Sequence, residues 1–82
     1  MNQEIINESI SLTIETIDNY VKYKYPPGGF VYAVLSNNLM EAFNRADSIN
    51  TKYMKDIVSY VYNHIPMDCW GSKEIVDKWL KK

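Results

Sequence analysis

The fold is decided by the stretch Pro26-Pro27-Gly28-Gly29, which divides the chain into an N-terminal and a C-terminal part. Two prolines cannot extend the preceding helix, because proline lacks the backbone N–H group and fixes φ. Pro26 also disfavours helical geometry at Tyr25. The two glycines then permit a sharp turn and a close approach of the backbone to a neighbour. We therefore expect one helix before this stretch and further helices after it.

The segment before the break, residues 2–23, has the apolar period of an amphipathic helix. Its stripe recurs every three or four residues and consists of Ile6, Ile10, Ile14, Ile17 and Val21. β-Branched residues are frequent in it, but the length and the period favour helix over strand. A helix of about 20 residues is about 30 Å long, which is long for so small a domain. We therefore expect its apolar face to form an oligomer seam.

Three further helices are predicted after the break, over residues 30–45, 51–64 and 73–81. Each segment carries an apolar stripe at helical spacing. The side chains of Asn50, Asp47 and Ser48 can each accept a hydrogen bond from the free N–H groups at the start of the helix over residues 51–64. Asn50, which directly precedes this helix, is the favoured N-cap. Pro66 ends that helix, and Ser72 caps the last one. The prediction is an all-α, four-helix single domain over residues 1–82, with a long N-terminal helix and an oligomeric state.

The composition of the 82 residues limits the class of protein. A hydrophobic content of 46% is ordinary for a globular chain and excludes extensive disorder. No apolar run approaches the roughly 20 residues that span a membrane, and no basic cluster marks a secretory signal. The single cysteine, Cys69, excludes an internal disulfide, and with one histidine it argues against a metal site. We expect a cytoplasmic protein with no membrane partner.

Charge is unevenly distributed along the chain. The formal net charge of −1 argues against a general nucleic-acid coat protein. Residues 1–21 contain four acidic residues and no Lys or Arg, whereas residues 22–82 contain nine basic and six acidic residues. The acidic part is explained most simply as a solvated helix face. Local positive charge can still bind a small anionic ligand.

Aromatic and basic residues are concentrated around the glycine turn, in residues 20–32. Aromatic rings can stack on bases, lysines can neutralise phosphate, and a glycine turn at a helix start presents free N–H groups. The ligand-binding residues predicted here are Tyr23, Lys24, Tyr25, Gly28, Gly29 and Phe30. The alternative is that the tyrosines pack the core and the glycines form only a turn. The Walker A and Rossmann patterns are absent.

The remaining ligand-binding candidates are Asn37, within the helix predicted over residues 30–45, and Asp47, Asn50, Trp70 and Ser72, in the connections. Amides can recognise base edges, Asp47 can accept from a ribose hydroxyl, and Trp70 offers a stacking face. The alternatives are capping and turn formation for the polar residues and core packing for Trp70. Cys69 has no evident activating base, so we predict no catalytic residue. We also predict no metal and no cofactor.

From Tyr25 onward the chain resembles a family of short proteins, many of which are encoded by phages and prophages. The resemblance rests on residues 26–30 (PPGGF), 33–35 (AVL), 37–39 (NNL), 46–50 (ADSIN), 66–72 (PMDCWGS) and 79–80 (WL). It does not include the first helix. The resemblance implies a phage-type accessory protein that acts in a bacterial cytoplasm.

Small non-enzymatic phage proteins commonly counter host defence, and some sequester nucleotide immune signals. By this analogy we expect a homo-oligomer that binds a cyclic oligonucleotide or an ADP-ribose-type signal without catalysis. The alternative is a protein–protein inhibitor of a host defence enzyme. A nucleic-acid-binding regulator is the third reading, which the near-zero net charge disfavours because phosphate contacts require a basic face.

Overall fold

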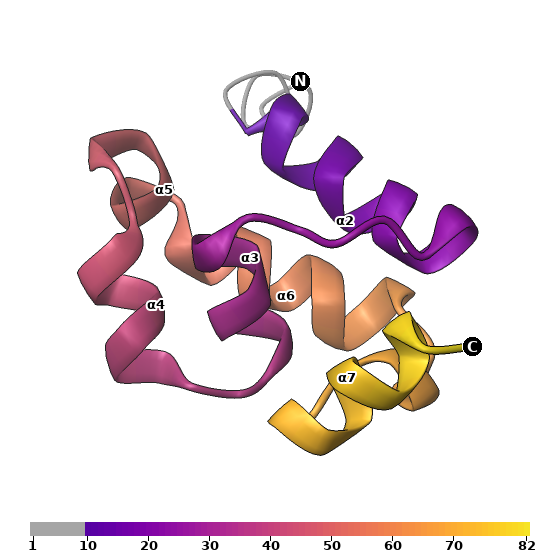
Figure 1. Cartoon of the computed structure of the whole chain (residues 1–82). Helices are drawn as coiled ribbons and strands as arrows, with labels where there is room; N and C mark the ends of the chain where they lie inside the picture. The colour runs from indigo at the N-terminus through magenta and orange to yellow at the C-terminus, as the bar shows by residue number, and fades with distance from the viewer. Residues whose placement is uncertain (1–9) are drawn as a thin grey trace.

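The computed structural model describes residues 10–82, and every regular element in this range is helical. The elements in chain order are α2 (Ser11–Tyr23), α3 (Gly29–Leu35), α4 (Leu39–Arg45), α5 (Ser48–Lys52), α6 (Met54–His64), the 3-10 turn η1 (Met67–Cys69) and α7 (Lys73–Leu80) (Figure 1). The all-α prediction is confirmed. The four-helix count is wrong, because these residues form six α-helices. None of the described helices is long and apolar enough to cross a membrane.

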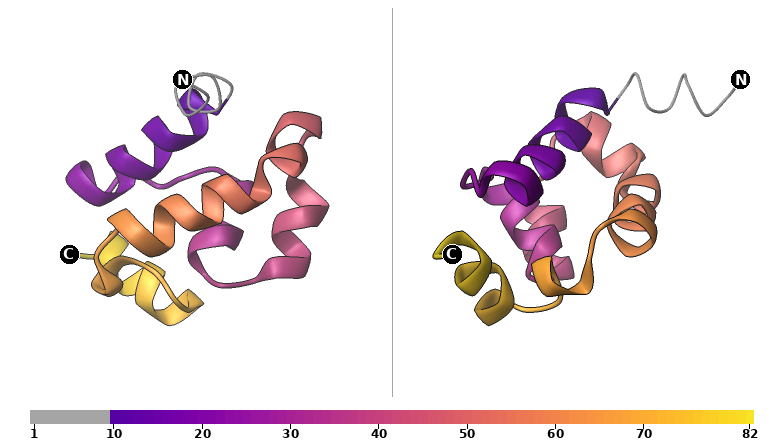
Figure 2. Two further views of the ribbon diagram at one scale, coloured as in Figure 1. Left: turned by 180° about the vertical axis from the view of Figure 1, so that it is seen from behind. Right: turned by 90° about the vertical axis from the view of Figure 1, so that its right-hand side faces the viewer.

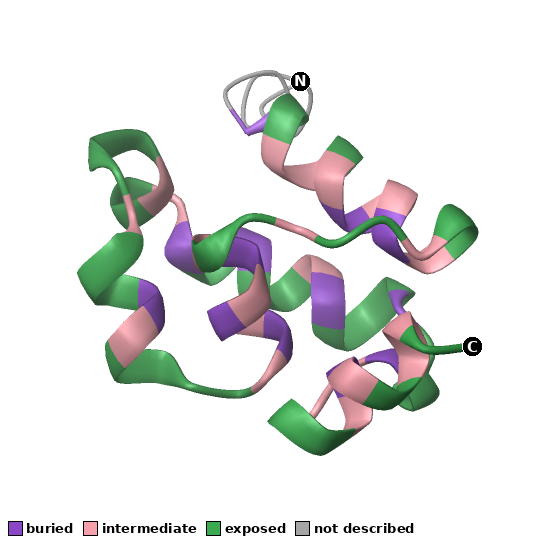
Figure 3. Cartoon of the chain, in the orientation of Figure 1, coloured by how far each residue is buried: buried purple, intermediate pink, exposed green. Residues whose placement is uncertain are grey.

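α3 lies at the centre of the fold and contacts α2, α4 and α7. α2 packs against α6 on one side of α3, and α7 packs with η1 on another (Figures 1 and 2). Figure 3 shows that the buried residues lie on the inward faces of these elements. The main core cluster contains Ile10, Ile17, Tyr20, Val31, Leu35, Ile57, Val61, Ile65, Cys69 and Val76. A second cluster of Ala33, Ala42 and Met54 joins α3, α4 and α6.

The apolar stripe of α2 is buried within the chain. Ile17 is fully buried and Ile10 almost so, while Ile14 and Val21 pack against the same core. The prediction of an oligomer seam along this face is wrong for the described residues, because α3 and α6 of the same chain already cover it. The start of the predicted helix, residues 2–9, lies outside the described residues.

The predicted helix over residues 30–45 is two helices, because the backbone changes direction at Asn37. Asn37 has a left-handed φ of 63°, which asparagine tolerates better than most residues. Ser36 ends α3, and Asn38 caps α4 by accepting a hydrogen bond from the N–H of Glu41 at 3.3 Å. The local sequence Ser-Asn-Asn therefore ends one helix and begins the next.

The predicted helix over residues 51–64 is also divided, into α5 and α6. Asp47 caps α5 by accepting from the N–H of Asn50 at 2.7 Å. The prediction of Asn50 as the preferred cap is therefore wrong, because the helix begins earlier than expected. The last helix is confirmed: Ser72 caps α7 and accepts from the N–H of Ile75 at 3.2 Å.

Candidate ligand-binding site

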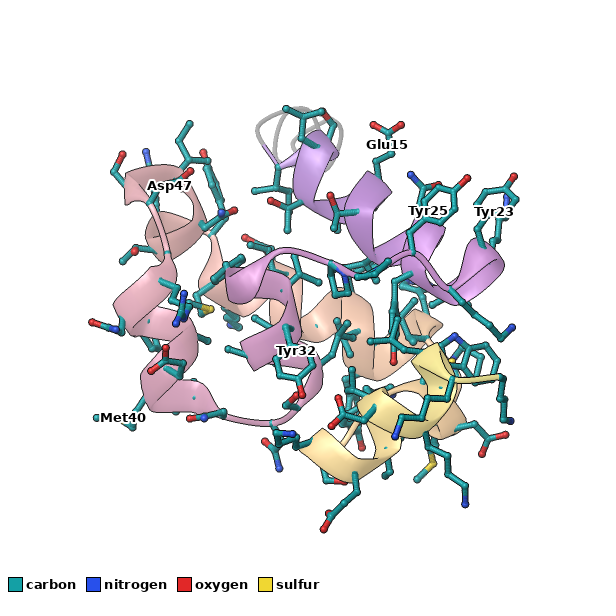
Figure 4. The ribbon with its side chains drawn as sticks, in the orientation of Figure 1. Glu15, Tyr23, Tyr25, Tyr32, Met40 and Asp47 are labelled. Atoms are coloured by element: carbon teal, nitrogen blue, oxygen red, sulfur yellow. The ribbon has the colours of Figure 1, made fainter. Side chains whose placement is uncertain are left out.

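The residues predicted to bind a ligand lie in separate parts of the structure. Tyr23 and Tyr25 lie at one end of the molecule, and Asp47 lies at the opposite end (Figure 4). Gly28 is the N-cap of α3, and Gly29 is its first residue. The glycine turn therefore leads directly into a helix, as predicted, but it is not joined to the other candidates in a single site.

Four of the predicted residues have structural roles. Asp47 and Ser72 are the N-caps described above. The carboxamide oxygen of Asn50 accepts a hydrogen bond from the hydroxyl of Thr13 at 2.9 Å, which ties α5 to α2. Phe30 is partly buried and packs against both core clusters. These contacts are sufficient to explain the four side chains without a ligand.

The end of α2 forms an exposed basic and aromatic surface. The ring centroids of Tyr23 and Tyr25 are 5.3 Å apart, and both residues are more than half exposed. Lys24 has a left-handed φ of 59°, and its Nζ lies 4.3 Å from the ring centroid of Trp79. The Nζ of Lys82 lies over the same ring at 4.8 Å. Lys24 thus joins α2 to α7, a contact that the sequence pattern did not indicate.

A hollow of about 450 Å³ lies beside the glycine turn. Its walls include Gly29 and Tyr32 of α3, Arg45 of α4 and Lys73 of α7. The volume is in the range of small-molecule sites, which are about 300–1,000 Å³. Gly29 was predicted as a ligand-binding residue, whereas Tyr32, Arg45 and Lys73 were not. We take this hollow as the candidate ligand-binding site.

Arg45 lies directly against Gly29. A Cβ at position 29 would be 2.9 Å from Nη1 of Arg45 and 3.0 Å from its Cδ. Glycine is therefore needed for the present position of the arginine, whereas a Cβ at Gly28 would point into open space. The Nε of Arg45 donates to Glu41, and the two Nη groups form no hydrogen bond within residues 10–82. These groups form a fork that suits a phosphate.

Lys73 supplies the second cation of the hollow. Its Nζ lies 2.9 Å from Oδ2 of Asp77, and the hydroxyl of Tyr32 donates to Oδ1 of the same carboxylate at 2.7 Å. These two hydrogen bonds hold the pKa of Asp77 below its ordinary value. Figure 4 shows Tyr32 pointing from α3 toward α7. The carboxylate thus fixes one wall of the hollow.

Both cations of the hollow are paired with carboxylates on their own helices. Arg45 pairs with Glu41 and Lys73 with Asp77, in each case across one helical turn. Such exposed pairs contribute little to stability. An anion that enters the hollow can therefore compete for both cations without a large loss of folding free energy.

Ser36 adds an unusual feature to the wall of the hollow. Its Oγ is buried and has no hydrogen-bond partner within the described part of the chain. Most buried hydroxyl groups in proteins are paired. A buried hydroxyl group that is unpaired within residues 10–82 therefore lies beside the hollow.

Asn37 and Trp70 line a different concavity, an apolar groove between α4 and α6. The Nε1–H of Trp70 donates to the carbonyl oxygen of Ile65 at 3.0 Å, and its ring packs against the main core, as the core alternative predicted. The groove has a volume of about 100 Å³. This is too small for a nucleotide, since small-molecule sites are about 300–1,000 Å³.

A third hollow, of about 650 Å³, lies between α2 and α6 and is acidic. Glu15, Asp18 and Asp56 line it, and the hydroxyl of Tyr60 donates to Asp18 at 2.6 Å. Residues 10–82 contain no cluster of three side chains that could hold a metal ion. The negative charge makes this hollow unfavourable for an anionic ligand.

Cys69 is a core residue in this fold. It is fully buried, and burial raises the pKa of its thiol, an effect to which Asp68 adds. A buried neutral thiol is a poor nucleophile, because the thiolate is the reactive form. His64 is exposed, and its ring lies 5.0 Å from that of Tyr60. Cys69 is therefore suited to packing and not to nucleophilic attack.

Comparison with protein-family models, with curated proteins and with solved structures finds no match to this chain.

Proposed function

We propose that this protein is a non-catalytic binding protein that holds a nucleotide-type anion in the hollow beside the glycine turn. The observation that carries the proposal is the position of Arg45 against Gly29, with Lys73 on another wall of the same hollow. The two cations come from separate helices, and one of these cations is a guanidinium group with two Nη groups. Such a pair is suited to hold a phosphate group.

The other walls suit the remainder of a nucleotide. The ring of Tyr32 offers an apolar surface against which a base or a ribose can pack. Asn38 also lines the hollow, and its carboxamide NH₂ group is a donor, because only its oxygen is used in capping α4. The hollow thus combines phosphate-binding cations with an aromatic wall and an amide.

The expected class of ligand comes from the resemblance to phage accessory proteins, by analogy with small phage proteins that counter host defence. The ligand we favour is an immune signal of the cyclic oligonucleotide or ADP-ribose type, which the protein would sequester. Sequestration requires binding without turnover, and neither Cys69 nor His64 lines the hollow. The basic aromatic end at Tyr23 and Tyr25 is not part of this site.

The proposal is tested by calorimetric titration of the purified protein with mononucleotides, cyclic di- and trinucleotides and ADP-ribose. Gly29→Ala places a methyl group 2.9 Å from Nη1 of Arg45, which is too close for the guanidinium to keep its present position. Hydrogen bonds to charged groups are worth about 1.5–3 kcal/mol, so we expect the affinity to fall roughly 10- to 150-fold. Gly28→Ala is the matched control and should bind like the wild type, because its Cβ points into open space.

Two results would contradict the proposal. One is that no nucleotide in the panel binds to protein that is free of co-purified ligand. The other is that Gly29→Ala and Gly28→Ala bind with the same affinity while both remain folded by circular dichroism. Lys73→Gln is a second, independent variant, since it removes the other cation and leaves Arg45 in place.

A further inference from the structure

Four large apolar side chains are exposed on neighbouring surfaces of α4 and α6. Leu39 is 57% exposed and Phe43 46% on α4, and Val58 is 41% exposed and Tyr62 72% on α6. Each pair is four residues apart, so its members lie on the same side of their helix. We call this surface the α4–α6 face. The apolar groove of about 100 Å³ opens on it.

No charged side chain of residues 10–82 lines the groove at the centre of the α4–α6 face. The exposed Lys55 lies at the edge of the face, three residues before Val58 on α6. Among residues 10–82, the groove is lined mainly by apolar and aromatic residues, and the polar groups that line it are the amides of Asn37 and Asn38, the phenol of Tyr62 and the indole of Trp70. Single exposed apolar residues are common on proteins, whereas a continuous apolar surface around a groove marks an interaction site.

We propose that the α4–α6 face binds a second copy of this chain about a two-fold axis. In such an interface the same surface of both copies is in contact, so a charged residue near the axis would face the same charged residue of the other copy and be repelled by it. The groove at the centre of the α4–α6 face has no charged lining residue within the described part of the chain. The α4–α6 face also combines a small apolar groove with exposed apolar side chains, so each copy can offer an apolar side chain to the groove of the other. This inference does not depend on the proposed ligand.

The available area is sufficient for a weak dimer. A fully covered aromatic side chain buries about 150–250 Å², and Leu and Val bury somewhat less, so the four side chains, scaled by their exposure, offer about 400 Å² in each copy. With the amide rim, two copies together approach about 1,000 Å², which is the lower limit for a specific interface. Interfaces of this size are weak, so we expect the fraction of dimer to depend on protein concentration.

The test is sedimentation velocity of the full chain over a concentration series from about 1 to 500 μM, a range that covers weak dimers. The mass of the wild type should rise from 9.6 kDa toward twice that value. Val58→Lys should remain a monomer at every concentration, because two lysines would then meet across the axis. Leu12→Lys is the matched control: Leu12 is 77% exposed but lies on α2, so this variant should associate like the wild type.

A wild-type protein that stays monomeric over the whole range would overturn the inference, as would undiminished association of Val58→Lys. Loss of association in Leu12→Lys would also overturn it, because the interface would then include α2. Tyr62→Lys keeps the test decisive if Val58→Lys fails to fold, since Tyr62 is the more exposed of the two.

Discussion

Removal of the Tyr20 hydroxyl should destabilise the fold to a measurable extent. Tyr20 is fully buried, and its hydroxyl donates to the carbonyl oxygen of Cys69 at 2.8 Å, which joins α2 to η1. Burial raises the pKa of Tyr20 well above its ordinary value, so the hydroxyl stays protonated as a donor. In Tyr20→Phe the carbonyl group of Cys69 remains in the core without this donor.

The size of the effect follows from the burial of the acceptor. A buried acceptor left without its partner costs about 1–3 kcal/mol. In a domain of this size, a loss of 1 kcal/mol lowers the Tm by about 4–8 °C. We therefore expect the Tm of Tyr20→Phe to be roughly 5–20 °C below that of the wild type.

Thermal unfolding followed by far-ultraviolet circular dichroism measures this difference. Tyr25→Phe is the matched control, because Tyr25 is exposed and a surface change of this kind is worth less than about 0.5 kcal/mol. A Tm of Tyr20→Phe within about 2 °C of the wild type would refute the reasoning, since the buried bond would then contribute almost nothing.

Three further outcomes are expected. Ser72→Ala should lose the cap of α7 and about 1 kcal/mol of unfolding free energy in urea, whereas the exposed Ser59→Ala should not; equal losses would contradict the capping role. Asn37→Val should lose about 1–2 kcal/mol at its positive φ while Asn37→Gly keeps wild-type stability, and a tolerated valine would argue against that turn. Burial and the bond to Asp18 raise the pKa of Tyr60 to about 12, so its contribution to stability is complete below pH 10 and is lost as the pH rises toward 12. The alkaline loss of stability should be smaller in Tyr60→Phe, and an unchanged pH profile in urea unfolding would contradict this.

The helical class and the main core could be predicted from the apolar period, but the division of the helices could not. Leu35 and Leu39 are four residues apart, so the apolar stripe continues unchanged across the break at Asn37. Periodicity cannot detect such a break. The local signal was the pair Asn37-Asn38, in which one residue accepts a left-handed φ and the other caps the next helix.

The candidate site could be predicted only in part. Gly29 was predicted because a glycine turn at a helix start presents free N–H groups to an anion, whereas the structure shows Arg45 packed against it. Arg45 and Lys73 could not be predicted, because they reach α3 only through the packing of α4 and α7. Tyr23 and Tyr25 were favoured by composition, but the left-handed turn between them leaves both on the exposed end of α2.

The proposed ligand site is tested most directly by nitrogen–proton correlation NMR during titration with the nucleotide that binds most tightly. We predict shifts at the backbone amides of Gly29, Tyr32 and Lys73 and at the Nε–H of Arg45, with little change at Tyr25. Shifts confined to the basic aromatic end or to the α4–α6 face would contradict the site, as would a spectrum that no nucleotide changes.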